Sequence, residues 1–518
     1  MLALAAAAAL HAALALAPSR AGAEPAEFLP VRHPAYEEIE ALAARGRLDS
    51  IAVYTRPLAR IDVARALLRA RRLDPAVETD LHFQRLEREL ARELTDLDAP
   101  PGQRETGPLV DLGPREQRFR LSAAGHLLGD YDERRDAAHY MFRDESAAGA
   151  RMSLQLWPAI AGYEELGLTR IRSARAFVDP IVQHTDLEIA VLRAELTARA
   201  GAFTAAAGYD DFRWGPGRRG TLLLSDAAGP MGFLSESIRI GGRVTAAAMT
   251  GQISRAEQRY VSAHRIEAEI GRRLTVGLGE AVRYRSADVD LLYALGILPY
   301  AIVRRIQIRD ASSDSVRVLE RANVMASADV VWRPIPDLSF TSELLVDDIA
   351  TKSTGVPDRF GYQLGVRSDR PFGTHAIRLL GEYTRVRNYT YSVDYDEDFV
   401  YRGRPLGFVL GPDVENIFTE AVFDVSRDWQ LRWSGDFTNH GEGRIGVPWV
   451  EGSGAVSNAG LSGVVERRRE VFGDARWMPR DDVDLSVGVG YRRLVNEDNV
   501  AGRDRNAWLG RMALDVRY

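Results

Sequence analysis

The 518-residue chain contains no cysteine, so no disulfide can hold its fold together. Small secreted domains usually depend on disulfides, and that class is excluded. Lysine is almost missing as well: Lys352 stands alone among 67 basic residues, and the rest are arginine. A GC-rich genome produces this bias, and so does selection for arginine forks that bind acidic sugars or lipid phosphates. The formal net charge of −6 argues against a nucleic-acid partner.

Long apolar stretches are missing beyond the first two dozen residues. No later run reaches about 18 residues, the length that a helix needs to cross a bilayer. The longest runs from Leu291 to Val303 and is interrupted by Pro299. The sequence therefore predicts no transmembrane helix. A membrane-spanning β-barrel stays possible, because its apolar residues alternate with polar ones along each strand.

The start of the chain has the features of an export signal. It is apolar up to Ala17 and continues to the small residues Ala21-Gly22-Ala23. This pattern predicts a signal peptide over residues 1–23, with the mature chain beginning at Glu24. The protein is thus expected to leave the cytoplasm.

Residues 24–112 are predicted to form a small α-helical domain on the periplasmic side of a membrane. Apolar residues repeat at helical spacing in three segments, and Asp74-Pro75 is a typical start for the third. No residue of this domain suggests catalysis. The repeats are Tyr36, Ile39, Leu42 and Ala43, then Val63, Ala66, Leu67 and Ala70, then Val77, Leu81, Leu86, Leu90 and Leu94.

From residue 113 to residue 518 the apolar period changes from helical to two, which is typical of strands. The clearest alternation covers residues 274–284, 338–346, 429–437 and 483–491. Within residues 274–284, Glu280 is the one charged residue on the apolar face. We expect about 18 antiparallel strands that close into an all-β transmembrane barrel.

The lengths of the connections favour a barrel over a soluble sandwich. Tight connections fall at residues 241–242, 271–273, 334–337, 427–428 and 479–482. Most are followed, one strand later, by a long polar segment, at residues 130–149, 210–234, 286–321, 387–416 and 440–462. Short turns on one side and long loops on the other describe an outer-membrane barrel.

The last strand also fits such a barrel. Trp508, Met512, Leu514 and Val516 alternate up to the terminal Tyr518. An aromatic at the final outward position suits the membrane interface. It also resembles the signal by which the barrel assembly machinery recognises its substrates. Outer-membrane lipid and that machinery are therefore expected partners.

The inward faces of the strands carry charges of both signs. Most of them are expected to form cross-strand ion pairs in a narrow lumen, and the alternative is a role in conducting a solute. The candidates are Arg265, Glu267, Glu269, Glu343, Asp347, Arg378, Glu382, Arg432, Asp436, Arg511, Asp515 and Arg517.

The most distinctive segment is residues 209–226. An aromatic ring can stack on a sugar, and an arginine fork can bind a carboxylate. We therefore predict a polysaccharide-binding site with an exposed Trp214. The alternative is an ordered loop that folds into the barrel mouth and is held by Arg–Asp pairs to the barrel wall. The predicted binding residues are Arg213, Trp214, Arg218, Arg219 and Asp226, and the predicted loop-shaping residues are Gly215, Pro216, Gly217 and Gly220.

The same segment resembles the Wzi-type capsule assembly proteins, in its Trp-Gly-Pro-Gly at residues 214–217 and in Gly229-Pro230-Met231. Residues 48–68, 343–348, 389–391 and 401–413 are also similar to segments of that family. The resemblance covers nearly the whole mature chain. It implies an 18-stranded outer-membrane barrel that binds capsular polysaccharide or exopolysaccharide at the cell surface, as a lectin without enzyme activity. The pair Arg218-Arg219 departs from other members, which can carry an uncharged or acidic pair.

Other chemistry is weakly represented. The histidines show no metal-ligand spacing, and we expect no metal and no cofactor. Two further hypotheses stay open: a diffusion channel for acidic saccharides, and a barrel enzyme. The enzyme would need a partner for His375 or His440, and none is obvious in the sequence.

Overall fold

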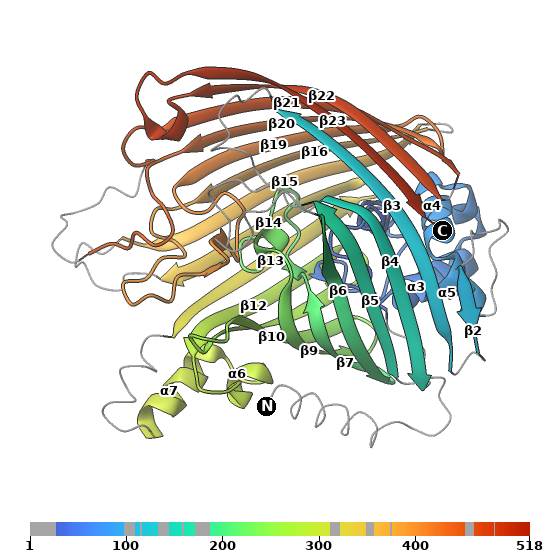
Figure 1. The fold of residues 1–518 in the computed structure, drawn as a ribbon, viewed down its shortest axis with the longest axis horizontal. Helices are drawn as coiled ribbons and strands as arrows, with labels where there is room; N and C mark the ends of the chain where they lie inside the picture. The colour runs from blue at the N-terminus through green and yellow to red at the C-terminus, as the bar shows by residue number, and fades with distance from the viewer. Residues whose placement is uncertain are drawn as a thin grey trace.

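The computed structural model describes residues 27–97, 109–113, 117–132, 145–157, 160–170, 187–310, 322–348, 357–372, 375–450, 460–480 and 482–517. The predicted signal peptide and Tyr518 lie outside these residues. The described chain forms a closed β-barrel with a helical domain at one end (Figure 1).

The barrel is an antiparallel sheet in which each strand pairs with the next along the chain. The circuit closes where β23 pairs with β3. Among the described residues the sheet holds 19 strands, of which 18 form the circuit, as predicted, and β2 (Val110–Leu112) adds only a short pairing to β3. The strands of the circuit are β3 (Phe119–Asp132), β4 (Glu145–Trp157), β5 (Ile160–Arg170), β6 (Leu187–Ala200), β7 (Phe203–Asp210), β9 (Met231–Ile240), β10 (Val244–Ser254), β11 (Arg259–Ile270), β12 (Leu274–Arg285), β13 (Asn323–Ile335), β14 (Leu338–Asp348), β15 (Arg359–Phe372), β16 (His375–Val386), β19 (Val414–Asp424), β20 (Trp429–His440), β21 (Glu466–Arg480), β22 (Val483–Val495) and β23 (Arg505–Arg517).

The helical domain contains α2 (Ala35–Ala44), α3 (Arg60–Leu73), α4 (Leu81–Glu89) and α5 (Ala91–Asp96). The first two predicted helices are confirmed. The third is divided, because a 3₁₀ turn over Pro75–Thr79 precedes α4 and Asp80 caps a new start by accepting a hydrogen bond from the His82 amide. β2 lies within the predicted helical range but pairs with the barrel.

The outer face of the barrel carries the apolar side chains that the alternation predicts. Trp433, Val487, Val489, Trp508 and Met512 are all more than half exposed. Aromatic pairs stack near the end where the helical domain lies: Trp332 on Phe340 and Trp429 on Trp477. An apolar band bordered by aromatic rings is the surface of a barrel that contacts lipid. None of the described helices is both long and apolar enough to cross a membrane.

Several inward charges form the expected ion pairs. On the wall, Arg265 binds Asp329 at 2.9 Å and Arg432 binds Glu420 at 3.1 Å. Others turn toward the inserts that fill the lumen, as when Glu267 accepts a hydrogen bond from the Thr55 hydroxyl at 2.7 Å. The side chain of Arg517 lies outside the described part of the chain.

The connections are sorted as predicted. Short turns, such as residues 241–243, 271–273 and 336–337, lie at the end of the barrel that holds the helical domain. Long connections lie at the opposite end (Figure 1), and they include the described residues 286–310 and 387–413. An even strand number brings both ends of the barrel to the side of the short turns, which in such barrels is the periplasm.

The absence of cysteine makes this orientation testable with single-cysteine variants. Val447 follows β20 at the long-loop end and is 59% exposed, and Leu73 of the helical domain is 69% exposed. On intact cells, a maleimide too large to pass the outer membrane should label Val447→Cys. It should label Leu73→Cys only after that membrane is opened. Labelling of Leu73→Cys on intact cells would place the helical domain outside the cell and overturn the orientation.

Candidate functional site

Two inserts enter the lumen from opposite ends and join by a short ladder. The strand β1 (Thr55–Arg56) comes from the helical domain, and β8 (Arg213–Trp214) comes from the long connection between β7 and β9. They pair antiparallel, with Thr55 opposite Trp214 and Arg56 opposite Arg213. The Gly215 amide adds a hydrogen bond to the Tyr54 carbonyl at 2.9 Å. The predicted site segment therefore forms the centre of a plug.

Trp214 lies inside this plug, and the expectation that it is exposed is wrong. Only 3% of the residue is accessible. Its ring contacts Phe212 edge-on at 6.5 Å, and its amide donates to the Leu224 carbonyl at 2.9 Å. The ring is thus part of a hydrophobic core that also includes Leu222, Leu223 and Leu224. The sequence could not separate a buried ring from a stacking platform, because the residues next to Trp214 are the same in both cases.

Arg213 and Asp226 bind each other. The guanidinium lies 3.2 Å from the carboxylate and also donates to the carbonyls of Gly217 and Arg218. Asp226 in turn binds Arg32 at 2.7 Å. These contacts fix the shape of the loop, but neither pair involves the wall, where the alternative interpretation placed the Arg–Asp pairs.

Arg218 and Arg219 bind the barrel wall. Arg218 lies 2.7 Å from Glu37 of α2 and 3.0 Å from Glu420 of β19. Arg219 lies 2.8 Å from Asp436 of β20. Glu382 of β16 accepts from both backbone amides, at 2.6 Å and 2.9 Å. The pair that departs from the resemblance therefore anchors the loop inside the barrel.

The predicted loop-shaping residues occupy positions that exclude larger side chains. Gly215 has a φ of +124°, a conformation that L-residues rarely adopt. A Cβ at Gly217 would lie 2.2 Å from the Gly220 carbonyl oxygen, and one at Gly220 would lie 3.2 Å from the Phe408 ring. Pro216 follows Gly215 in this turn and fixes its own φ. Small residues are required here because the backbone of this turn packs closely against itself and against neighbouring side chains.

Glu37, which the sequence did not single out, is the hub of this plug. Its carboxylate binds Arg218 at 2.7 Å, Arg432 at 2.7 Å and Arg378 at 3.0 Å. Three groups that are distant in sequence thus meet at one side chain: the helical domain, the β7–β9 connection and the wall. Nearby, Glu40 pairs with both Arg56 and Arg367. One feature of the sequence could have identified Glu37. Several acidic residues fall within one turn of this predicted helix, in a chain that is rich in inward-facing arginines.

The helical domain holds carboxylates whose ionisation stabilises it. Burial alone would raise the pKa of Glu38, but Arg85 and His82 outweigh it and lower that pKa to about 2. Burial is likewise outweighed at Glu93, where Arg60 and Arg92 lower the pKa to about 2. A carboxylate whose pKa is lowered in the folded state stabilises the fold at pH values above its ordinary pKa of 4.5. That contribution is lost as the pH falls toward the folded value.

We therefore expect the helical domain to loosen between pH 4.5 and about 2. Each shift corresponds to about 3 kcal/mol. Arg85 also binds Asp424 of the wall at 2.5 Å, so docking of the domain should weaken together with its fold. Hydrogen exchange of α2–α5 amides across this pH range measures the effect. Glu38→Gln should exchange faster at neutral pH and respond less to acid. Unchanged exchange in the parent protein would contradict the assignment.

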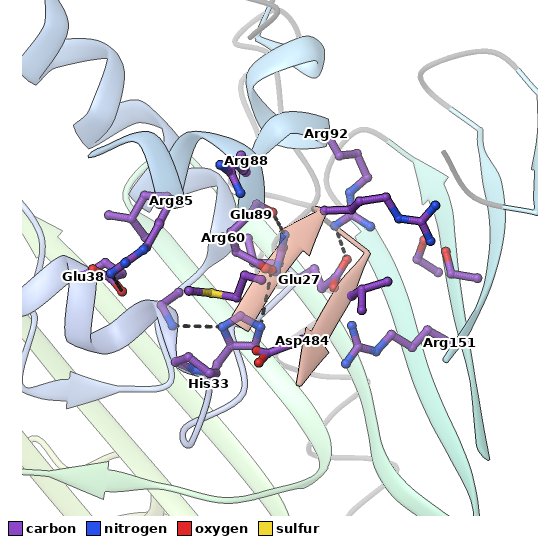
Figure 2. Close-up of a pocket in the computed structure, with 18 of the residues that line it drawn as sticks. Glu27, His33, Glu38, Arg60, Arg85, Arg88, Glu89, Arg92, Arg151 and Asp484 are labelled. Carbon is purple, nitrogen blue, oxygen red and sulfur yellow. Dashed lines mark hydrogen bonds and ion pairs between the residues drawn. The ribbon is translucent and has the colours of Figure 1, made fainter. Parts of the chain in front are cut away.

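A cavity of about 200 Å³ lies between the helical domain and the wall strands β3–β5, β21 and β22 (Figure 2). Seven arginines line it, four of them from the helical domain. Each has a carboxylate partner: Arg60 with Glu89, Arg85 with Glu38, Arg88 with Asp428, Arg92 with Glu27, Arg151 with Glu165, Arg476 with Asp484 and Arg480 with Asp482. Of these pairs, Arg88–Asp428 joins the helical domain to the barrel, and the others neutralise charges within the domain or within the wall. The cavity faces the short-turn end, so an extracellular polymer would not reach it.

At the long-loop end, the plug is covered by a segment that we call the outer cap, residues 387–413 with β17 (Val400–Tyr401) and β18 (Arg404–Pro405). Tyr391 of the cap donates its hydroxyl hydrogen to the Leu222 carbonyl at 2.7 Å and accepts from the Phe408 amide at 3.1 Å. The cap is thereby fixed onto the β7–β9 connection.

The outer cap presents arginine side chains at the surface. The Arg402 guanidinium lies over the Tyr401 ring, 5.0 Å from its centre, and 3.3 Å from the Tyr209 hydroxyl. Arg402 is exposed, and Arg404 is partly exposed. The Tyr401 ring is itself buried, with 6% of the residue exposed, whereas Tyr209 is partly exposed beside Arg402. This surface therefore offers charged forks together with the edge of one partly exposed ring.

The catalytic and metal alternatives gain little from the described residues. His375 Nδ1 lies 2.6 Å from the Val425 carbonyl and His440 Nε2 lies 3.0 Å from the Pro412 carbonyl. Within the described ranges, no group of histidine and acidic residues could hold a metal ion.

This geometry defines a class: a transmembrane β-barrel whose lumen is filled by a helical domain from one end and an inward-folded loop from the other. The chain is similar in structure to Wzi of Escherichia coli, an outer-membrane protein involved in group 1 capsule assembly that is described as a carbohydrate-binding β-barrel. The TM-score is 0.62 at 14% identity, over 95% of this chain and 99% of Wzi.

Other outer-membrane proteins of solved structure also match. OprD of Pseudomonas aeruginosa matches with a TM-score of 0.44 and 9% identity, over 78% of this chain and 94% of its own. No family model matches the sequence, and no curated protein matches it. At these identities the likeness concerns the fold alone. The resemblance found in the sequence is confirmed at the level of a Wzi-like fold, and membership of that family stays a prediction.

Proposed function

We propose that this protein resides in the outer membrane, binds capsular polysaccharide or exopolysaccharide and holds it at the cell surface. The observation that carries the proposal is the closed lumen. The β1–β8 ladder joins both inserts across the barrel, while the outer cap offers the arginine side chains of Arg402 and Arg404 to the outside. A barrel blocked in this way suits binding better than transport. The likeness to Wzi supports the same function.

The proposed contacts are in the outer cap rather than on Trp214. An acidic polymer would place carboxylates against Arg402 and Arg404 and a sugar ring near the partly exposed Tyr209. Each contact is weak, but many barrels that hold one chain gain by multivalency. The proposal includes export by residues 1–23 and insertion by the barrel assembly machinery. It assigns no enzyme activity to the protein.

The test is binding of alginate, a polymer of acidic sugars, to the purified protein in lipid nanodiscs, with neutral dextran as the comparison. We expect alginate to bind and Arg402→Ala/Arg404→Ala to lose most of that binding. Arg272→Ala, at an exposed turn of the opposite end, is the matched control. Equal binding of both polymers, or equal binding by both variants, would refute the proposed surface.

The main alternative is a diffusion channel for acidic saccharides. Current recordings from the same protein in planar bilayers distinguish it from the binding function. The filled lumen leads us to expect no stable open-channel current. Large steady currents from the intact protein, with no alginate binding, would favour the channel.

A further inference from the structure

The connection between β12 and β13 forms a helical hairpin, α6 (Leu291–Ala294) and α7 (Tyr300–Asp310), at the long-loop end (Figure 1). It packs on the outside of the barrel rather than over its mouth. A Cβ at Gly296 would lie 2.8 Å from Cβ of both Ala248 and His264. These two residues are opposite each other on β10 and β11, and their neighbours Ala247 and Arg265 face the lumen. The hairpin therefore covers part of the outer wall.

The covered wall carries a polar row that a lipid-facing surface would not tolerate. Glu236, Ala248, His264 and Glu280 are paired across four neighbouring strands on the outward side. Glu280 lies 3.4 Å from His264 Nε2 and accepts from the Tyr300 amide at 2.6 Å. A charged side chain on the lipid face destabilises a barrel. The hairpin supplies the partners that make Glu280, the misfit of its strand, acceptable.

The inner side of the hairpin is fully packed. Tyr293 and Tyr300 are 2% and 0% exposed, and they form a cluster with Tyr260, Val282 and Tyr284 of the wall. The rings of Tyr293 and Tyr284 lie 4.7 Å apart, and those of Tyr300 and His264 lie 4.3 Å apart. The hairpin is therefore a built part of the wall and not a loose loop.

The outer side of the hairpin is an exposed apolar surface. Ile297 is 77% exposed, and the other large apolar residues on this side are Leu291, Leu292, Leu295, Ile302 and Ile306. An apolar surface of this kind usually marks a contact with protein or membrane. It continues the lipid-facing wall, where Ile266 on β11 and Leu278 on β12 are 51% and 57% exposed. Arg305 and Arg309 of α7 are exposed along the same helix.

We propose that residues 291–310 are embedded in the outer leaflet of the membrane and bind its lipids. The apolar side contacts acyl chains, and Arg305 and Arg309 bind the phosphate groups of the headgroups. Ile302 and Ile306 share the exposed face of α7 with Arg305 and Arg309. At a lipid interface such arginines lay their apolar stems along the acyl chains and extend their charged heads to the phosphates. Continuity with the lipid-facing wall commits the surface to lipid rather than to a protein partner. This inference is independent of polysaccharide binding.

Spin labels on single cysteines test the acyl contact, because the chain has no cysteine of its own. Ile297→Cys and Ile302→Cys would be compared in phosphatidylethanolamine–phosphatidylglycerol vesicles with Leu278→Cys on the wall and Val447→Cys in an aqueous loop. We expect both hairpin labels to match Leu278→Cys, with several-fold better access for oxygen than for a water-soluble nickel chelate. If both matched Val447→Cys, the embedding would be refuted.

The phosphate contact is tested by native mass spectrometry with added phosphatidylglycerol. Arg305→Gln/Arg309→Gln should retain several-fold less lipid than the parent protein. Arg272→Gln/Arg273→Gln, an exposed pair at the opposite end, is the matched control and should retain the parent amount. Equal retention by the two variants would overturn the headgroup contact.

Discussion

Glu37→Gln should open the barrel to ions. The substitution keeps the shape of the side chain but removes the negative charge that binds Arg218, Arg378 and Arg432. Removing the sole partner of a buried charge costs about 3–5 kcal/mol. Here each arginine loses one carboxylate and keeps another, Glu420 for Arg218 and Arg432 and Asp369 for Arg378, so the cost for each is below that limit but falls on all three. The helical domain and the β7–β9 connection should therefore both detach from the wall part of the time.

Single-channel recording in planar bilayers measures this effect. The parent protein should be silent, and Glu37→Gln should give intermittent currents and a lower melting temperature of the helical domain. Glu78→Gln is the matched control, since Glu78 is an exposed acid of the same domain and pairs with Arg71 at 2.7 Å. Silence in Glu37→Gln, with a melting temperature equal to that of the control, would show that this hub does not hold the plug.

The wall of the barrel could be predicted from the sequence because its physical rule is local. The alternation of Trp429, Leu431 and Trp433 with polar residues can be recognised without knowing which residues are their neighbours on β19 and β21. The sorting of connections by length then gave the orientation. The division of the third helix was missed, although Asp80 is a recognisable cap, because the apolar repeat continues across it.

The site could be predicted only in part, because its contacts join residues that are far apart in sequence. Residues 209–226 were identified as the distinctive segment, and the structure places them at the centre of the molecule. Whether these side chains point into the lumen or toward solvent could not be predicted from the sequence. An arginine that binds a sugar and one that binds Glu37 have the same neighbours in sequence. The partners of Arg218 are 181 and 202 positions away. On the outer wall, by contrast, a local signal was present. Glu280 is the one charged residue on the apolar face of its strand, and it lies where the hairpin covers the wall.

Trp214→Ala should loosen the plug strongly, whereas Arg402→Ala should weaken polysaccharide binding and leave the plug intact. Trp214 is 3% exposed, and truncating a buried tryptophan costs about 3–5 kcal/mol through lost contacts and the cavity left behind. The strands of the wall do not depend on this ring, so the barrel should still insert. Hydrogen exchange should rise at β1 and β8 in Trp214→Ala and stay unchanged in Arg402→Ala.

Comparison of the two variants decides between the binding surfaces. On cells, Arg402→Ala should shift polysaccharide from cell-bound to free, and Trp214→Ala should do so only to the extent that the outer cap moves with the plug through Tyr391 and Leu222. The opposite pattern would be full retention in Arg402→Ala and loss in Trp214→Ala with unchanged exchange at β1 and β8. That pattern would mean that the polymer reaches the loop itself, and it would return the binding role to Arg213, Trp214, Arg218, Arg219 and Asp226.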